Sequence, residues 1–214
     1  MQFSTFLESV VKIKHLELSG EVSHAKMSPP YRLELAEKMK AKAKTARKAG
    51  VMALFYPNID DNTNLVLILR KTYRGVHSAQ VGFPGGKYED EDDNDLMLTA
   101  IRETEEEIGV VREHFKVLKT MSPIYIPPSN FMVHPFIGIS QENLNFVKQD
   151  EEVEAIIEVM LSDFLDETNT ITTTVPTSFD VEVDVPAFKL NGHIVWGATA
   201  MMLGEIKDLL KQVL

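Results

Sequence analysis

Residues 81–109 read VGFPGGKYEDEDDNDLMLTAIRETEEEIG, and no other stretch says as much about the fold. Val81 to Phe83 form a short apolar run that predicts a strand. The Pro-Gly-Gly sequence at 84–86 ends that run, and an acidic loop follows it. A helix is then predicted from about Asp95 to Ile108, because Gly109 follows as a typical C-terminal stop. The stretch therefore predicts a strand, a loop and a helix.

Three glutamates share one face of the predicted helix. Glu103, Glu106 and Glu107 stand at positions i, i+3 and i+4, which are neighbours on a helix surface. Like charges at this spacing repel one another, so a helix with three of them on one face favours a neutralising cation. Oxygen ligands with no His or Cys nearby suit Mg2+ or Mn2+. The alternative interpretation is an acidic face that simply lies in solvent.

The acidic charge is concentrated in this part of the chain. Between Lys87 and Glu107 there are ten acidic and two basic residues, a local charge of −8 within a net charge of −10. The remaining chain is therefore close to neutral. Because nucleic-acid binding is driven by Lys and Arg, we expect no nucleic-acid partner.

The turn and the helix together resemble the Nudix box, whose pattern is Gly, a loop, an acidic residue and then Arg-Glu-x-x-Glu-Glu-x-Gly. Here it runs from Gly86 through Arg102 to Gly109. The stretch from Gly86 to Arg102 is two residues longer than the commonest form, so the acidic position falls on Asp92 or Asp93. Thr104 stands where an aliphatic residue is usual.

This resemblance implies an α/β fold, the Nudix-type α/β/α sandwich around a mixed β-sheet, with an N-terminal helical extension. It implies that the box glutamates bind Mg2+ or Mn2+ together with a backbone carbonyl of the glycine turn. Arg102 would orient the glutamates through charge-assisted hydrogen bonds. A further carboxylate from outside the box is assigned to Glu152. The predicted catalytic residues are Arg102, Glu103, Glu106, Glu107 and Glu152, and the predicted metal ligands are Gly85, Glu103, Glu106 and Glu107.

The segment that precedes the box resembles the coenzyme A pyrophosphatase branch of the family. The sequence HSAQVGFPGGK at 77–87 is similar to that branch's His-x-Gly-Gln/Glu-Val-x-Phe-Pro-Gly-Gly-Lys pattern, with Ala79 in place of the Gly. Similarity continues at Pro128 to Pro135 and at Ile194 to Thr199. The resemblance implies that coenzyme A or an acyl derivative is split into 3′,5′-ADP and 4′-phosphopantetheine, with Arg70, His77, Gln80 and Lys87 contacting the substrate.

Other functions stay open at this point. Within the class, ADP-ribose or another nucleoside diphosphate linked to a second group is an alternative substrate. A catalytically silent Nudix-like nucleotide-binding module is the alternative outside the enzymes, although such modules usually lose a box glutamate. Trp196 either stacks on adenine or lies in the core, and the core interpretation is preferred.

Composition places the chain among globular proteins, since 44% of its 214 residues are apolar and 25% are charged. The absence of cysteine excludes disulfides and thiolate metal sites. No apolar run approaches the roughly 20 residues needed to span a bilayer. We therefore expect a cytoplasmic protein with a small-molecule diphosphate substrate and no membrane partner. The oligomeric state is not readable, and a homodimer is one option.

The remaining elements follow from periodicity. We divide the chain into a helical extension, residues 1–47, and a Nudix hydrolase domain, residues 48–214. The extension is predicted to hold a short amphipathic helix near the N-terminus and a second helix over 32–47. Strands are predicted at 51–56, 65–69, 115–121, 133–139 and 154–159, with a short helix capped by Ser162 and Asp163, a hairpin between Thr170 and Phe188, and a terminal helix over 201–213.

Overall fold

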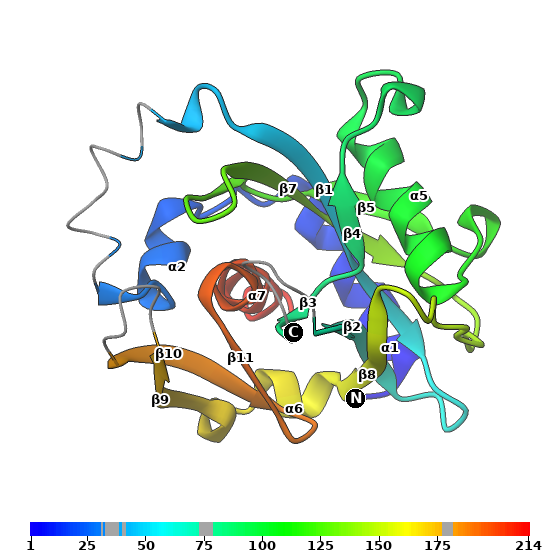
Figure 1. Cartoon of the computed structure of the whole chain (residues 1–214). Helices are drawn as coiled ribbons and strands as arrows, with labels where there is room; N and C mark the ends of the chain where they lie inside the picture. Colours follow the sequence, from blue (N-terminus) through cyan, green and yellow to red (C-terminus); the bar gives the residue numbers. More distant parts are fainter. Residues whose placement is uncertain (31, 33–38, 40–41, 73–78, 177–181) are drawn as a thin grey trace.

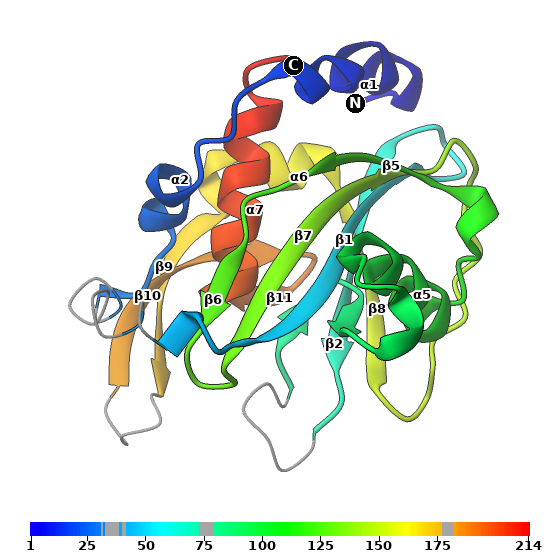
Figure 2. The same cartoon turned by 90° about the horizontal axis from the view of Figure 1, so that it is seen from above.

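A mixed β-sheet with helices on both faces forms the centre of the molecule (Figures 1 and 2). The computed structural model describes residues 1–30, 32, 39, 42–72, 79–176 and 182–214. The predicted α/β/α sandwich is confirmed, because helix α5 (Leu96–Ile108) covers one face of the sheet and helix α7 (Gly197–Leu210) covers the other.

The order of the main strands in the sheet is β3-β2-β1-β7-β5. Strands β1 and β7 run parallel from Arg47↔Phe131 to Phe55↔Ile139, whereas the other pairings are antiparallel. Strands β4, β6 and β8 pair with β1, β7 and β2 respectively. The bounds are β1 Arg47–Pro57, β2 Thr63–Arg70, β3 Val81–Gly82, β4 Gly85–Lys87, β5 Lys116–Thr120, β6 Ile124–Ile126, β7 Phe131–Ile139 and β8 Val153–Met160.

The box segment lies inside the sheet, where β1 and β2 diverge. These strands pair with each other only near their turn, from Phe55↔Leu65 to Pro57↔Thr63. Further along, β4 pairs with β1 at 49–51 and β3 pairs with β2 at 68–69. Strand β7 occupies the other edge of β1 over this length, so β4 must lie on the side that faces β2. The glycine turn is thereby fixed by the sheet rather than left in a free loop.

Helix α5 has well-defined ends and a buried polar residue. The Asp95 side chain accepts a hydrogen bond from the backbone N–H of Met97 at 2.9 Å, and Gly109 ends the helix at φ 71°. Thr104 is fully buried, and its hydroxyl donates to the Ala100 carbonyl at 2.6 Å. A hydroxyl is therefore tolerated at this usually aliphatic position, because the helix itself satisfies it.

Residues of β1 alternate between two hydrophobic clusters, as a strand covered on both faces requires. Met52, Leu54 and Tyr56 pack on the α5 side. Ala53 and Phe55 pack on the α7 side, in the larger cluster. Helix α1 (Phe3–Val10) joins that cluster: its buried residues are Phe3, Phe6 and Val10, and the rings of Phe6 and Phe55 lie 5.3 Å apart.

A buried carboxylate attaches the N-terminal region to α7. Glu205 is 1% exposed and accepts hydrogen bonds from the backbone N–H of Gly20 at 2.8 Å and from that of Ser122 at 3.1 Å. The Ser122 hydroxyl donates to it at 2.6 Å, and His24 Nε2 lies 3.4 Å away. Helix α2 (Glu21–Lys26) therefore rests on α7 through polar contacts as well as apolar ones.

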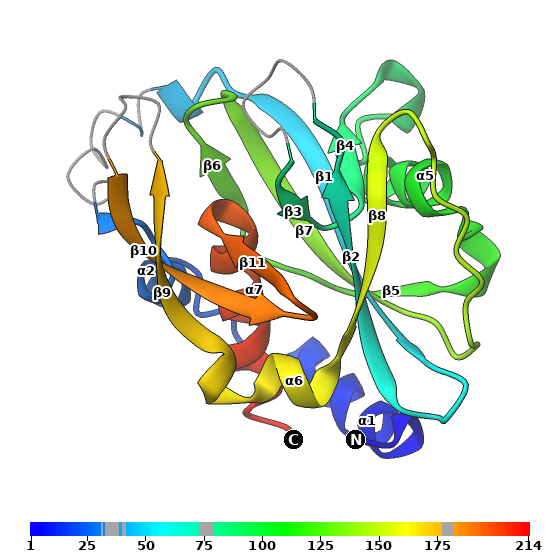
Figure 3. The same cartoon turned by 60° about the horizontal axis from the view of Figure 1, so that its bottom comes forward.

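A second, three-stranded sheet in the order β11-β10-β9 lies beside α7 (Figure 3). Its strands are β9 (Thr170–Pro176), β10 (Glu182–Leu190) and β11 (His193–Trp196). Strands β9 and β10 pair in antiparallel orientation, as the hairpin predicted between Thr170 and Phe188 requires, while residues 177–181 lie outside the described part of the chain. Helix α6 (Leu161–Leu165) connects β8 to this sheet.

Several boundaries differ from the sequence prediction. Ser162 and Asp163 lie inside the first turn of α6, whose N-cap is Met160 without a side-chain bond, because β8 runs directly into the helix. Helix α7 begins at Gly197, earlier than the apolar stripe indicated. Of the helix predicted over 32–47, residues 33–38 and 40–41 lie outside the described residues, and Arg47 is the first residue of β1 instead of the last residue of a helix. Among the described residues, no helix has the length and apolarity needed to cross a membrane.

Candidate active site

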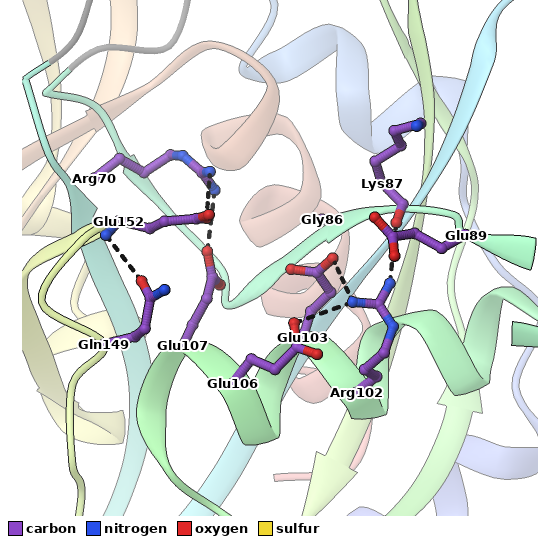
Figure 4. Close-up of a pocket in the computed structure, with 10 residues that line it drawn as sticks. All are labelled: Arg70, Gly86, Lys87, Glu89, Arg102, Glu103, Glu106, Glu107, Gln149 and Glu152. Carbon is purple, nitrogen blue, oxygen red and sulfur yellow. Dashed lines mark hydrogen bonds and ion pairs between the residues drawn. The ribbon is translucent and has the colours of Figure 1, made fainter. Parts of the chain in front are cut away.

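One cavity of about 350 Å3 gathers most of the predicted site residues (Figure 4). It lies where α5 meets β4, the end of β2 and the segment that enters β8. Five carboxylates and three cationic side chains line it, so its formal charge is negative. The lining residues are Arg70, Gly86, Lys87, Glu89, Arg102, Glu103, Glu106, Glu107, Gln149 and Glu152.

Arg102 joins the box helix to the acidic loop. Its Nη1 donates to Glu103 at 3.0 Å and to Glu106 at 3.1 Å. Its Nη2 donates to the Lys87 carbonyl at 3.1 Å. The hydrogen bond with Asp92 is the main reason why the pKa of Arg102 is raised. The structure thus places Arg102 on two of the three box glutamates.

Asp92, and not Asp93, is the acidic loop residue that holds Arg102. Arg102 Nε donates to Asp92 Oδ1 at 3.0 Å, and Nη2 donates to Oδ2 at 3.2 Å. The Thr99 hydroxyl and the Glu89 backbone N–H also donate to Oδ2, at 2.8 and 2.9 Å. Asp92 is 2% exposed, whereas Asp93 is exposed to solvent. Burial opposes ionisation, but these hydrogen bonds outweigh it and lower the pKa of Asp92 to about 2.

Glu107 is the buried member of the glutamate face. Its side chain is 3% exposed and accepts a hydrogen bond from the Gly85 backbone N–H at 2.7 Å. The pKa of Glu107 is raised to about 8, mainly by burial; Arg70 and the Gly85 N–H oppose the rise, and the carboxylates of Glu103 and Glu152 add to it. By formal charge, the five carboxylates that line the cavity exceed its three cationic side chains by two.

Arg70 lies between Glu107 and Glu152 rather than facing open solvent. Its Nη1 is 3.4 Å from Glu107 Oε1, and its Nη2 is 3.9 Å from Glu152 Oε2. Figure 4 shows the guanidinium over both carboxylates. Glu152, predicted from outside the box, therefore joins the same cavity as the box glutamates.

The glycine turn lies directly against the glutamate face. A Cβ on Gly86 would overlap the carboxylate of Glu103, so any residue larger than glycine would displace that carboxylate. Burial also raises the pKa of Glu103, while Arg102 opposes that rise.

The donor chemistry of this cavity fits a divalent cation that prefers oxygen. Its carboxylates are clustered, partly buried and short of neutralising charge. The carboxylates are also held in separate groups: Arg102 holds Glu103 and Glu106, and Arg70 holds Glu107. Within the described part of the chain, no three acidic or histidine side chains converge on a single ion position.

The remaining predicted residues have different outcomes. Lys87 lines the cavity, although Figure 4 shows its side chain pointing away from the carboxylates. Gln80 is not a lining residue, and its backbone carbonyl accepts from the Arg70 N–H at 3.0 Å. His77 lies outside the described residues. Trp196, preferred as a core residue, is only partly buried, because it ends β11 just before α7 begins.

Two lining residues were not predicted. Glu89 precedes the turn Asp90–Asp92 and shares a capping box with Asp92. Gln149 accepts the Glu152 backbone N–H at 2.9 Å through its side chain, and its own N–H donates to the Glu107 carbonyl at 3.0 Å. No sequence signal marks Gln149, because its role comes from the path of the chain between β7 and β8.

Known proteins resemble this chain both in sequence and in fold. Residues 46–172, more than half of the chain, match the family described as NUDIX domain. The solved structure of a MutT/nudix family protein from Enterococcus faecalis superposes with a TM-score of 0.52 at 19% identity, over 84% of this chain and 69% of that chain. At that identity the likeness concerns the fold alone.

Two curated relatives are similar in sequence. A peroxisomal coenzyme A diphosphatase from Caenorhabditis elegans, ndx-8, is 29% identical over 162 residues, which are 75% of this chain and 68% of that protein. An uncharacterized Nudix hydrolase from Yersinia pestis (strain Pestoides F), NudL, is 38% identical over 101 residues, or 47% of this chain. The match spans half of the length of the Yersinia relative.

Proposed function

The chain belongs to the Nudix family of hydrolases, and from this premise we propose that it cuts the pyrophosphate bond of coenzyme A or an acyl-coenzyme A. The products would be 3′,5′-ADP and 4′-phosphopantetheine or its acyl form. The observation that carries the proposal is the cavity in which Glu103, Glu106, Glu107 and Glu152 gather beside Arg70 and Lys87.

We assign the metal site to Glu103, Glu106 and Glu107, with the Gly85 backbone carbonyl as a further ligand. Mg2+ or Mn2+ held there would neutralise charge on the phosphoryl oxygens and lower the pKa of the attacking water. The Gly85 N–H supports this assignment, since its bond to Glu107 Oε2 fixes one carboxylate beside the turn. Arg102 is assigned the positioning of Glu103 and Glu106.

The reaction adds one water oxygen to a phosphorus atom and breaks the bridging P–O bond. One proton of the water passes to a carboxylate of the cavity. Both products are phosphates: one carries the water oxygen, and the other keeps the bridging oxygen. Glu152 completes the set of carboxylates that can accept this proton, because it shares the cavity and its side chain is 53% exposed. Arg70 and Lys87 are the cations available to the substrate phosphates.

The choice of coenzyme A is supported by the sequence at 77–87 and by the name of the C. elegans relative. All three box glutamates are present, which argues against a silent binding module. The cytoplasmic location stays a prediction, since that relative is named as peroxisomal. The division at residues 47 and 48 and the oligomeric state also stay predictions.

The test is hydrolysis of a panel of coenzyme A, acetyl-coenzyme A, ADP-ribose, NADH and oxidised dGTP with Mg2+ or Mn2+, with products identified by mass. Glu106→Gln should abolish cleavage. Glu105→Gln is the matched control, because Glu105 lies on the same helix as Glu106, pairs with Arg112 and does not line the cavity.

Faster release of 3′,5′-ADP from coenzyme A than cleavage of the other compounds supports the proposal. Preference for ADP-ribose or a nucleotide keeps the chemistry and overturns the substrate. No cleavage with either metal makes the binding module the better description.

A further inference from the structure

Arg70 has a role in the cavity that differs from simple substrate contact. We propose that it is a positioning residue that competes with the divalent cation for Glu107 and Glu152, and that it turns to the substrate phosphates once the cation has replaced it. The proposal rests on the proposed metal-dependent function.

The position of Arg70 is fixed on both sides by backbone hydrogen bonds. Its N–H donates to the Gln80 carbonyl at 3.0 Å, and the Lys71 N–H donates to the Glu152 carbonyl at 2.9 Å. The register between β2 and β8 shifts between Leu69 and Arg70. This irregularity lies beside Glu152, the residue that precedes β8, so the side chains of Arg70 and Glu152 start from neighbouring points of the backbone.

Without Arg70, Glu107 would be a buried carboxylate with only the Gly85 N–H as its hydrogen-bond donor among the described residues. A buried charge that lacks a partner is strongly unfavourable. A divalent cation on Glu107 removes that need and also repels the guanidinium, whose Nη1 is 3.4 Å from the same carboxylate. Arg70 and the cation therefore oppose each other at one group.

The second arginine of the cavity is held much more firmly. Arg102 makes two bonds to the buried Asp92 and a third to the Lys87 carbonyl. Arg70 has one hydrogen bond at 3.4 Å to Glu107 and one ion pair at 3.9 Å to Glu152, whose side chain is 53% exposed. Of these two arginines, Arg70 is the one that can leave its carboxylates without breaking a buried network.

The test measures Mn2+ affinity by electron paramagnetic resonance of the free ion, on the full chain after chelator treatment and at fixed pH. Arg70→Ala is expected to bind Mn2+ about tenfold more tightly than the unchanged chain, because a nearby positive charge is removed. Arg70→Lys keeps the charge and is expected to stay within about threefold. The matched control is Arg112→Ala, which removes a cation from Glu105 outside the cavity.

A purely structural role for Arg70 predicts the opposite result, since the loss of the ion pairs would leave the carboxylates disordered. Unchanged or weaker Mn2+ affinity in a folded Arg70→Ala protein overturns the proposal. If this variant does not fold, Arg70→Met retains the aliphatic stem and is measured against Arg70→Lys. Equal affinities in that pair also overturn it.

Kinetics at saturating Mn2+ give the second readout. Arg70→Ala should raise KM for a diphosphate substrate about tenfold, with a smaller effect on kcat, because the contact with substrate phosphates is lost. If the unchanged chain binds no Mn2+, the proposed function fails together with this role. If it binds Mn2+ and the Arg70→Ala protein binds no tighter, only the role of Arg70 fails.

Discussion

Replacing Asp92 with Asn tests whether the acidic loop holds the box helix. Asp92 Oδ2 accepts from the Glu89 N–H, the Thr99 hydroxyl and Arg102 Nη2, while Oδ1 accepts from Arg102 Nε. An asparagine places an amide NH2 on one of these two sides, where it faces donors instead of accepting from them. Either orientation breaks bonds in a site that is 2% exposed.

The size of the effect follows from the pKa of Asp92. Its value falls from 3.8 to about 2 in the folded chain. A difference of nearly two units, at ~1.4 kcal/mol per unit, is worth about 2 kcal/mol of unfolding free energy. Because the folded pKa is depressed, this stabilisation is fully present above 3.8 and disappears as the pH falls toward 2. Asp92→Asn should therefore lose about 2 kcal/mol at neutral pH.

Urea unfolding gives the measurement, with Asp93→Asn as the control. Asp93 is the exposed neighbour in a left-handed conformation, φ 49°, which asparagine tolerates. Its substitution should change the unfolding free energy by less than about 0.5 kcal/mol. The difference in unfolding free energy between the two variants should narrow at a pH between 3.8 and about 2, where Asp92 loses its charge. Equal losses in both variants would refute the assignment of Asp92.

Three further outcomes are expected. In the presence of a chelator, the free energy of unfolding should fall as the pH rises from 4.5 through about 8, because the folded pKa of Glu107 is raised. Glu107→Gln should flatten this pH profile and abolish cleavage. If urea unfolding gives the variant the same pH dependence as the unchanged chain, the assignment is contradicted. Gly86→Ala should displace the Glu103 carboxylate and reduce kcat by roughly tenfold or more while the chain stays folded, and unchanged kcat would show that the close approach is unimportant. Glu205→Ala leaves two backbone N–H groups and a serine hydroxyl without their acceptor and should cost about 3 kcal/mol in thermal unfolding; a cost below about 1 kcal/mol would show that the N-terminal contact is weak.

The box was readable from sequence because its information is local. The spacing of Glu103, Glu106 and Glu107 fixes which helix face they share, whatever the rest of the fold does. The helix itself follows from Asp95 and Gly109, whose capping roles depend on adjacent residues. The prediction of a Nudix hydrolase rested on this local pattern, and the match of residues 46–172 to the NUDIX domain confirms it.

The acidic partner of Arg102 needed three-dimensional information. Asp92 and Asp93 are both acidic and adjacent, so sequence spacing left both open. Only the folded loop buries one and exposes the other, because the turn Asp90–Asp92 and the Thr99 hydroxyl surround a single carboxylate. Tertiary packing therefore decides that Asp92, and not Asp93, pairs with Arg102.

Contacts between distant segments likewise came only from the tertiary structure. Arg70 approaches Glu107 and Glu152 because β2 pairs with β8 and β4 lies between β1 and β2. Glu205 bonds Gly20 across 185 positions of the chain. Sequence alone determined the chemistry of the glutamate helix, since neighbouring residues define it. Strand pairing decided which cation lies beside Glu107 and Glu152, because it brings Arg70 to them from a segment that no local pattern relates to the helix.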